Sequence, residues 1–322
     1  MIRRVLLVLD GSERAERAIP YVMTLARAFG SEVLLLRVIE AKPGSDRLWT
    51  DPVEWRLERS EAKAYLEGVK KRFVDAEIAV DIDVGVGDAS EEILEMARAR
   101  RADLLALTTH GRGQATGVPV AGTAHKVVAA AETSILLVPA GTAENGRGPR
   151  RILVGLDGSP RAEWALRIAA AVARTADVPL VLAHVVPASE VLAVGDTGSL
   201  RAMAAELAKA SGKLARGYLA DAAKRLSARD LHISTRTASA KASVPRALAR
   251  LVAEEPDTLL VLSARGSTAM EGCTHGTVAQ ALLQAAEHPV LVLQDASRVA
   301  ASTQPSPERS RRRRNTEGLP RA

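Results

Sequence analysis

The sequence predicts an α/β protein made of two doubly wound domains in tandem. Three observations predict it: an internal repeat as long as a whole domain, short runs of Val, Leu and Ile, and longer segments of helical period between those runs. A length of 322 residues suits two domains of roughly 150 residues each. A composition with 47% hydrophobic and 25% charged residues is typical of globular proteins.

The repeat divides the chain. RRVLLVLDGS at 3–12 recurs as RRILVGLDGS at 150–159, and ADLLALTTHG at 102–111 matches DTLLVLSARG at 257–266. The offset grows from 147 to 155 residues, so the second half carries eight extra residues between its second and fourth strands. A repeat of this length is a domain, not a solenoid unit. We expect domains at 1–140 and 150–295, a Gly-rich linker at 141–149 and a tail at 296–322.

The elements of the first half follow in order from the alternation of apolar runs with helical periodicity. Its expected strands are 5–10, 32–39, 77–84, 103–109 and 135–139, and its expected helices are 13–29, 60–73, 90–100 and 122–131. Strands that are apolar on both faces and separated by helices are typical of a parallel sheet covered on both sides. Each half therefore has about five parallel strands, and ligands of such sheets bind at the carboxyl ends of the strands.

Charge and cysteine content limit the classes to which the protein can belong. The net charge is +6, but 296–322 contains seven arginines and two glutamates, so +5 belongs to this tail and the two domains are nearly neutral. The tail is rich in Ser, Thr, Pro and Gln, so we expect it to be disordered.

The single cysteine, Cys273, excludes an intramolecular disulfide framework and fits a reducing compartment. No apolar run reaches the roughly 18 residues of a membrane span, so we expect a cytoplasmic protein without a membrane partner.

Two acids stand at equivalent strand ends. Asp10 is followed by Gly11 and Ser12, and Asp157 by the same pair of residues. The serines are expected to cap the next helix, while glycine permits the turn. A carboxylate at the end of an apolar strand can accept hydrogen bonds from a ligand hydroxyl or amine. Val38 and Val185 end the second strand of each half, and on their own they indicate sheet core.

Glycine-rich loops follow the fourth strand of each half. In the second half Gly266 is followed by nine residues and then by Gly276 and Thr277, which open the last helix. Glycines let a backbone approach a ligand closely, and the start of a helix suits an anion such as phosphate. Neither loop has the Walker pattern, so spacing alone is a weak signal.

Together these parts resemble the universal stress protein family over nearly all of residues 1–295, twice over. The resemblance rests on the LVxxDGS opening, the H-V end of the second strand, VGDASEEIL at 86–94 and the G-xx-G-x9-G-[ST] loop. It implies Rossmann-like domains, pairing through the last strand and, in one subgroup, bound ATP, with Mg²⁺ only as the nucleotide's counter-ion. The adenosine and phosphate roles of that subgroup fall on Asp10, Val38, Gly111, Gly122, Thr123, Asp157, Val185, Gly266, Gly276 and Thr277.

The chain departs from the family pattern in both loops. Thr108 and Ser263 stand where the motif begins with Gly. In the first half ten residues separate Gly111 from Gly122, so an ungapped comparison puts Ala121 and Gly122 at the Gly and Ser/Thr positions. A one-residue shift instead gives those positions to Gly122 and Thr123. Whether one pocket, both or neither binds ATP stays open.

The leading hypothesis is a nucleotide-binding regulatory protein of the stress response without catalytic residues. The alternative is a stress adaptor with degenerate loops that binds no nucleotide, and a slow ATPase is a third, weaker reading. We expect the halves to pair within one chain through 135–138 and 290–293, with a homodimer as a further option.

Other residues give weaker signals. The six histidines do not form a spacing typical of a metal site, so no metal is expected. Two alternatives stay open for the Arg309–Arg314 cluster. Its charge suits nucleic acid, an acidic partner or anionic lipid, or it is part of a solvated tail without a partner. LWTDPVEW at 48–55 is expected to pack on the surface or to cover the nucleotide pocket.

Overall fold

A computed structural model describes residues 2–40, 52–109, 122–142, 146–187, 198–226, 230–240, 243–266, 275–285 and 287–294. The first half contains β1 (Arg4–Val8), α1 (Glu13–Glu16), α2 (Ile19–Phe29), β2 (Glu32–Ile39), α3 (Pro52–Val74), β3 (Val80–Val86), α4 (Ala89–Ala99), β4 (Leu104–Thr108), α5 (Gly122–Ala130) and β5 (Ser134–Val138). The second half contains β6 (Arg151–Gly155), α6 (Pro160–Ala176), β7 (Leu180–Pro187), α7 (Gly198–Leu226), β8 (Ile233–Ala240), α8 (Val244–Ala253), β9 (Thr258–Ser263), α9 (Thr277–Ala285) and β10 (Val290–Leu293).

All ten strands join one sheet, in the order β3-β2-β1-β4-β5-β10-β9-β6-β7-β8. Within each half every pairing is parallel, which confirms the predicted fold class. The strand order reverses between β1 and β4, and again between β6 and β9, and these are the points where open α/β sheets bind ligands.

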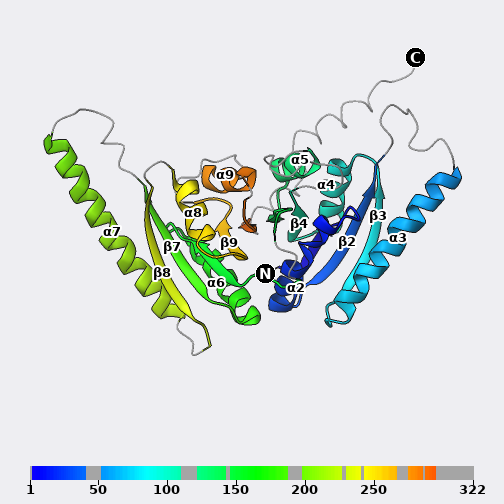
Figure 1. The fold of residues 1–322 in the computed structure, drawn as a ribbon, viewed down its shortest axis with the longest axis horizontal. Coiled ribbons are helices and arrows are strands. Elements are labelled where there is room, and N and C mark those ends of the chain that lie inside the picture. Colours follow the sequence, from blue (N-terminus) through cyan, green and yellow to red (C-terminus); the bar gives the residue numbers. More distant parts are fainter. Residues whose placement is uncertain are drawn as a thin grey trace, which may run out of the picture.

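The two halves meet at β5 and β10, the segments that the sequence predicts to pair. Their pairing is antiparallel, with Leu136 opposite Leu291. Each half therefore covers the other's sheet edge, which would otherwise offer free N–H and C=O groups to another chain. In Figure 1 the halves lie side by side, and the long helices α3 and α7 form the outer flanks.

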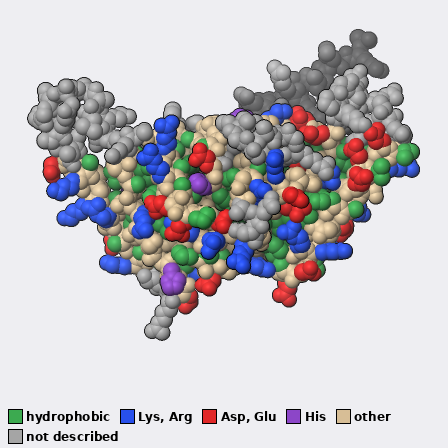
Figure 2. Space-filling model, in the orientation of Figure 1, with side chains coloured by type: hydrophobic (Ala, Val, Ile, Leu, Met, Phe, Trp, Pro, Cys, Tyr) green, Lys and Arg blue, Asp and Glu red, His purple; other side chains and the backbone are tan. Residues whose placement is uncertain are grey.

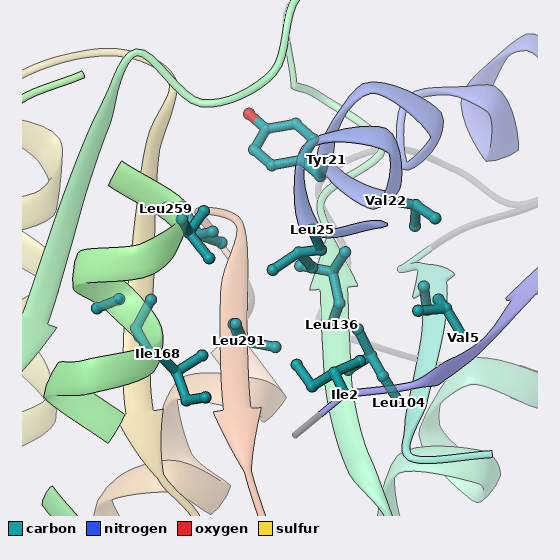
Figure 3. Close-up of a cluster of buried hydrophobic side chains, with 14 of the residues drawn as sticks. Ile2, Val5, Tyr21, Val22, Leu25, Leu104, Leu136, Ile168, Leu259 and Leu291 are labelled. Carbon is teal, nitrogen blue, oxygen red and sulfur yellow. The ribbon is translucent and has the colours of Figure 1, made fainter. Parts of the chain in front are cut away.

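Helices cover both faces of the sheet. Side chains of α2, α3, α6 and α7 share one buried cluster, and those of α4, α5, α8 and α9 share another. The first cluster crosses the boundary between the halves, where α2 contacts α6. Figure 3 shows Ile168 of α6 beside Leu291, and Leu25 of α2 beside Leu136. Each such side chain contributes about 1.5–3 kcal/mol on burial.

The segment before β6 also packs on the first half. A Cβ added to Gly148 would lie 2.4 Å from Thr24 Oγ1 and 3.3 Å from the carbonyl oxygen of Pro20. Part of the expected linker is thus held against α2. On the face in Figure 2 acidic and basic side chains are interspersed over both halves, in keeping with nearly neutral domains.

Two helices differ from the expected ranges. The expected helix at 13–29 is two helices, because Pro20 has no N–H to donate to the carbonyl of Glu16. In α6 the proline stands at the first position, Pro160, where that N–H is not needed, and the helix is continuous. The helix expected at 60–73 begins earlier, at Pro52, so Trp55 lies on α3 with Arg59 5.3 Å from the centre of its ring. The segment 48–51 lies outside the described residues.

No helix among the described residues combines the length and the apolar character needed to cross a membrane.

Candidate functional site

A cavity of about 430 Å³ opens at the carboxyl ends of β1, β2 and β4, at the first reversal of strand order. Three of the predicted site residues line it: Asp10 after β1, Val38 in β2 and Thr123 in the first turn of α5. Thr108 and Thr109 line it from the end of β4. Its volume is within the range of small-molecule pockets in proteins, about 300–1,000 Å³.

Asp10 is oriented by the helix start that follows it. Its Oδ1 accepts hydrogen bonds from the N–H of Ser12 at 2.9 Å and from the Ser12 hydroxyl at 2.6 Å. Ser12 Oγ in turn accepts the N–H of Ala15 at 3.2 Å and caps α1. Gly11 has a φ of 83°, so the turn requires glycine.

The second half repeats this arrangement. Asp157 Oδ1 accepts the N–H of Ser159 at 3.0 Å, Ser159 caps α6 and Gly158 has a φ of 80°. The predicted capping role of both serines is therefore confirmed. One oxygen of each aspartate is tied to the backbone, which fixes the direction of the carboxylate.

Asp157 and Gly266 lie in direct contact in the second half. A Cβ added to Gly266 would lie 2.4 Å from Asp157 Oδ2, so a larger residue would displace the carboxylate. The N–H of Gly276 donates to the carbonyl of Ala264 at 2.7 Å, which holds the start of α9 beside the end of β9. The structure thus brings together the predicted residues Asp157, Gly266, Gly276 and Thr277. The residues between, 267–274, lie outside the described part of the chain, and so does Cys273.

The ends of the second strands differ between the halves. Val38 is half-buried and lines the cavity, whereas Val185 is 7% exposed. Beside Val38, the guanidinium of Arg37 lies 5.5 Å from the centre of the Tyr65 ring. At the position equivalent to Arg37, His184 Nδ1 lies 2.7 Å from the carbonyl oxygen of Leu156.

The helices α5 and α9 settle the register that the sequence left open. Both are nine residues long and begin at Gly122 and Thr277, 155 residues apart. Their buried positions keep that spacing: Ala124 with Ala279, Val127 with Leu282 and Val128 with Leu283. The ungapped comparison therefore fits the structure, and Gly122 takes the place of Thr277. Gly111 lies outside the described residues, as does Ala121.

The GDAS segment before α4 has a capping role. Asp88 Oδ1 accepts the N–H groups of Ser90 and Glu91 at 2.9 and 3.1 Å, and the Ser90 hydroxyl also donates to it. These hydrogen bonds, the one from the Ser90 hydroxyl first, lower the pKa of Asp88. Lys126 of α5 lies 3.7 Å from its other oxygen, so the segment ties α4 to α5. In the second half Ser243 caps α8 instead.

A repeated polar cluster was missed by the sequence analysis. Tyr65 of α3 donates to Glu16 at 3.1 Å, and Tyr218 of α7 donates to Glu163 at 2.7 Å. Arg72 and Arg225 complete the two clusters, with contacts of 2.8 and 3.0 Å. Burial, and then the neighbouring glutamate, raise the pKa of each of these tyrosines. The sequence contains only three tyrosines, and two of them stand at equivalent positions of the repeat. This coincidence was the signal that could have indicated the clusters.

The described residues contain no group of three or more His, Cys, Asp or Glu side chains able to hold a metal ion.

Comparisons with known proteins agree with this architecture. The model of the universal stress protein family matches residues 1–139 and 148–294. The "universal stress protein in QAH/OAS sulfhydrylase 3′ region" of Thermus aquaticus is 31% identical over 140 residues, covering 43% of this chain and 99% of that protein.

Two solved structures match both halves at once. A universal stress protein from Archaeoglobus fulgidus has a TM-score of 0.58 at 20% identity and covers 90% of this chain and 98% of its own. A putative universal stress protein from Pseudomonas aeruginosa has a TM-score of 0.59 at 19% identity, with coverages of 93% and 96%. At these identities the two structures show the fold alone. With the family match over both halves, they establish that the chain belongs to the universal stress protein family and carries two of its domains in tandem.

Proposed function

We propose that this universal stress protein is a regulatory protein of the stress response that binds adenine nucleotide at the carboxyl ends of its strands. The observation that carries the proposal is the contact of Asp157 with Gly266, beside the start of α9. Only a residue without a Cβ leaves the Asp157 carboxylate in place there. The cavity next to Asp10 supports an equivalent site in the first domain.

The chemistry of these residues fits an adenine nucleotide. A fixed carboxylate accepts hydrogen bonds from ribose hydroxyls, and an apolar strand end such as Val38 or Val185 suits the base. In the second domain the glycines and the helix start suit phosphate, at Gly266, Gly276 and Thr277. The corresponding predicted residues of the first domain are Gly111, Gly122 and Thr123, but there Gly122 holds the place of Thr277. Mg²⁺ would enter only with the nucleotide. We place the protein in the cytoplasm, in keeping with its single cysteine.

The test begins with a native mass spectrum of the purified protein, which gives co-purified nucleotide, its stoichiometry and the oligomeric state together. Calorimetric titration with ATP follows. Asp157→Ala should weaken ATP binding at least tenfold, because it removes a fixed acceptor. Asp221→Ala, at an exposed position of α7, is the matched control and should bind like the parent protein. Absence of binding at millimolar ATP overturns the proposal.

A second candidate is an adaptor that acts through protein contacts without nucleotide. It is favoured by Thr108 and Ser263, which stand where the family loop begins with Gly; the Ser263 hydroxyl donates to the carbonyl of Arg265 at 2.9 Å. An adaptor with Gly266→Leu would keep its partners, whereas the nucleotide-binding protein would lose its ligand without unfolding. Neither candidate involves turnover, and phosphate release abolished by Asp157→Ala would contradict both.

A further inference from the structure

The outer helices α3 and α7 can be compared residue by residue. Their packed positions repeat at a spacing of 153 residues: Ala62 with Ala215, Leu66 with Leu219, Val69 with Ala222 and Tyr65 with Tyr218. All of the aliphatic members are buried, and both tyrosines bind a glutamate of the neighbouring helix. This register therefore also aligns the parts of α3 and α7 that precede the tyrosines.

Those preceding turns differ in charge. Glu58 and Glu61 of α3 line the first-domain cavity. The same spacing assigns their places to Ser211 and Leu214 of α7, and Leu214 is 75% exposed. The second strands show the same change, because Glu40 lines the cavity and its counterpart is Pro187.

The described lining of the first-domain cavity is consequently acidic. It contains four carboxylates, Asp10, Glu40, Glu58 and Glu61, and one guanidinium, that of Arg37. In the second domain the positions equivalent to the three glutamates are neutral, and Arg265 stands next to Gly266 in the loop after β9. At the surface of a protein, charges within a Debye length of about 10 Å still act on a ligand. The described carboxylates of the first cavity therefore disfavour a triphosphate, whereas the equivalent described positions of the second domain add no such repulsion.

We propose that the two sites select ligands of different charge: the first-domain cavity takes an adenine nucleoside without phosphate charge, and the second domain takes the triphosphate. This inference rests on the proposed nucleotide binding. The register of α5 supports it separately, since Gly122 occupies the place of Thr277, so the first helix start lacks the threonine hydroxyl.

The experiment measures adenosine, AMP and ATP binding to the full chain by calorimetry, with stoichiometry from native mass spectrometry. Asp157→Ala leaves only the first site, and Asp10→Ala leaves only the second. In the Asp157→Ala protein we expect adenosine to bind at least tenfold more tightly than ATP. In the Asp10→Ala protein we expect ATP to bind at least as tightly as adenosine.

Removing carboxylates from the first cavity and adding them to α7 tests whether charge causes the ligand selection. In the Asp157→Ala background, Glu58→Gln with Glu61→Gln should raise ATP affinity on the order of tenfold and leave adenosine affinity within twofold. The control is Glu67→Gln with Glu77→Gln, which makes the same change in net charge at exposed positions outside the cavity lining. In the Asp10→Ala background, Ser211→Glu with Leu214→Glu should weaken ATP binding to a similar extent. Both positions are exposed, so the second pair should fold.

The measurements separate a failure of the proposed nucleotide binding from a failure of the charge selection. If no variant or parent protein binds adenosine, AMP or ATP, the proposed function is wrong and this inference falls with it. If the Asp157→Ala protein binds ATP as tightly as adenosine, and removal of Glu58 and Glu61 charges changes nothing, the charge selection alone is wrong. Equal effects of the cavity pair and the control pair would also overturn it, because net charge would then explain the result.

Discussion

At position 266 the neighbouring Asp157 carboxylate leaves no room for a side chain. A methyl group there would overlap Asp157 Oδ2 and displace the carboxylate from its place in the proposed site. Gly266→Ala should therefore weaken ATP binding at least tenfold while the midpoint of thermal unfolding changes little. Gly217→Ala is the control, because that glycine lies in α7 with nothing within 4 Å of the added Cβ. The control should bind ATP normally and gain up to about 1 kcal/mol of stability. Unchanged ATP binding by Gly266→Ala would contradict the assigned site.

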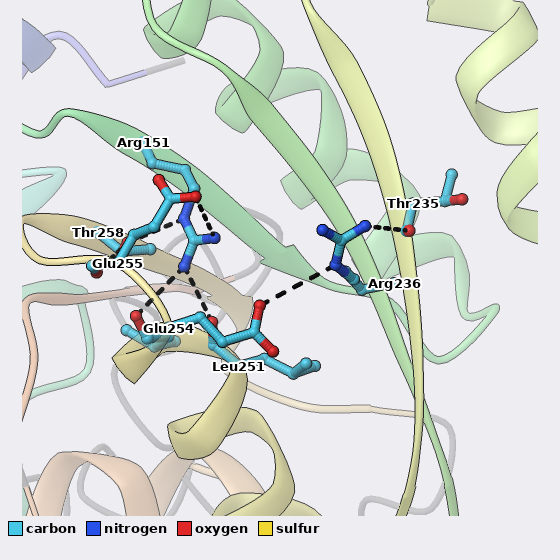
Figure 4. Close-up of polar contacts among 8 residues, drawn as sticks. Arg151, Thr235, Arg236, Leu251, Glu254, Glu255 and Thr258 are labelled. Atoms are coloured by element: carbon cyan, nitrogen blue, oxygen red, sulfur yellow. Dashed lines mark hydrogen bonds and ion pairs between the residues drawn. The ribbon is translucent and has the colours of Figure 1, made fainter.

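Arg151 shows how one arginine can join three elements (Figure 4). Its guanidinium is buried, donates to the carbonyls of Leu251 and Val252 at the end of α8 and to Thr258 Oγ1 in β9, and lies 3.4 Å from Glu255. Arg151→Met should lower the free energy of unfolding by about 2–4 kcal/mol, since it leaves buried acceptors without donors. The repeat-equivalent Arg4 has a side chain that is 55% exposed, so Arg4→Met should cost less than about 1 kcal/mol in the same denaturant titration. Equal losses would refute this account of burial.

At the scale of elements, the strands were predictable because β1, β4, β5 and their counterparts are buried on both faces and read as continuous apolar runs. The ends of the helices were harder to predict. The break before Ile19 depends on a single proline. The first two turns of α3 show no apolar face, since Val53 and Leu57 are exposed.

The candidate site was predictable in part for a similar reason. Asp10 and Asp157 follow from the rule that ligands lie at strand ends. Glu58 and Glu61 instead reach the cavity from α3, whose sequence shows no motif. The Glu–Tyr–Arg clusters join residues about 50 positions apart. Only the packing of α3 and α7 against α1 and α6 brings these residues together.

The second domain also contains elements whose stability depends on pH. Burial, together with Arg265, lowers the pKa of His275 just before α9, and burial lowers that of His288 just before β10. The two histidines therefore bind a proton less readily in the folded protein than in the unfolded chain, where histidines titrate at about pH 6.5. Above that pH the folded state keeps its full stability. As the pH falls through it, the unfolded chain takes up protons that the folded protein does not, and the free energy of unfolding decreases.

His275→Gln with His288→Gln should flatten this dependence. We expect the parent protein to lose stability between pH 7 and 5 in urea titrations, and the double variant to lose less. The exposed His125→Gln on α5 is the control and should follow the parent. A double variant as sensitive to pH as the parent would assign the loss to other groups.

At the scale of the whole molecule, the pairing of β5 with β10 makes two domains into one sheet. In the antiparallel register Leu136 faces Leu291, and both side chains belong to the cluster shared with α2 and α6. Val292 alternates to the opposite face, with the cluster of α4, α5, α8 and α9. The register therefore predicts which pairs of cysteines can form a disulfide.

In a Cys273→Ser background, Leu136→Cys with Leu291→Cys should oxidise to a disulfide, because directly opposed residues lie about 4.5–5.5 Å apart between Cα atoms. Leu136→Cys with Val292→Cys should not, since the two side chains lie on different faces of the sheet. Mass spectrometry of the peptides and a non-reducing gel report the product. A cross-link within one chain is the expected result, because each chain pairs its own edges. A disulfide-linked dimer would mean that the two halves exchange between chains, and the sheet in Figure 1 would then be completed by a second copy.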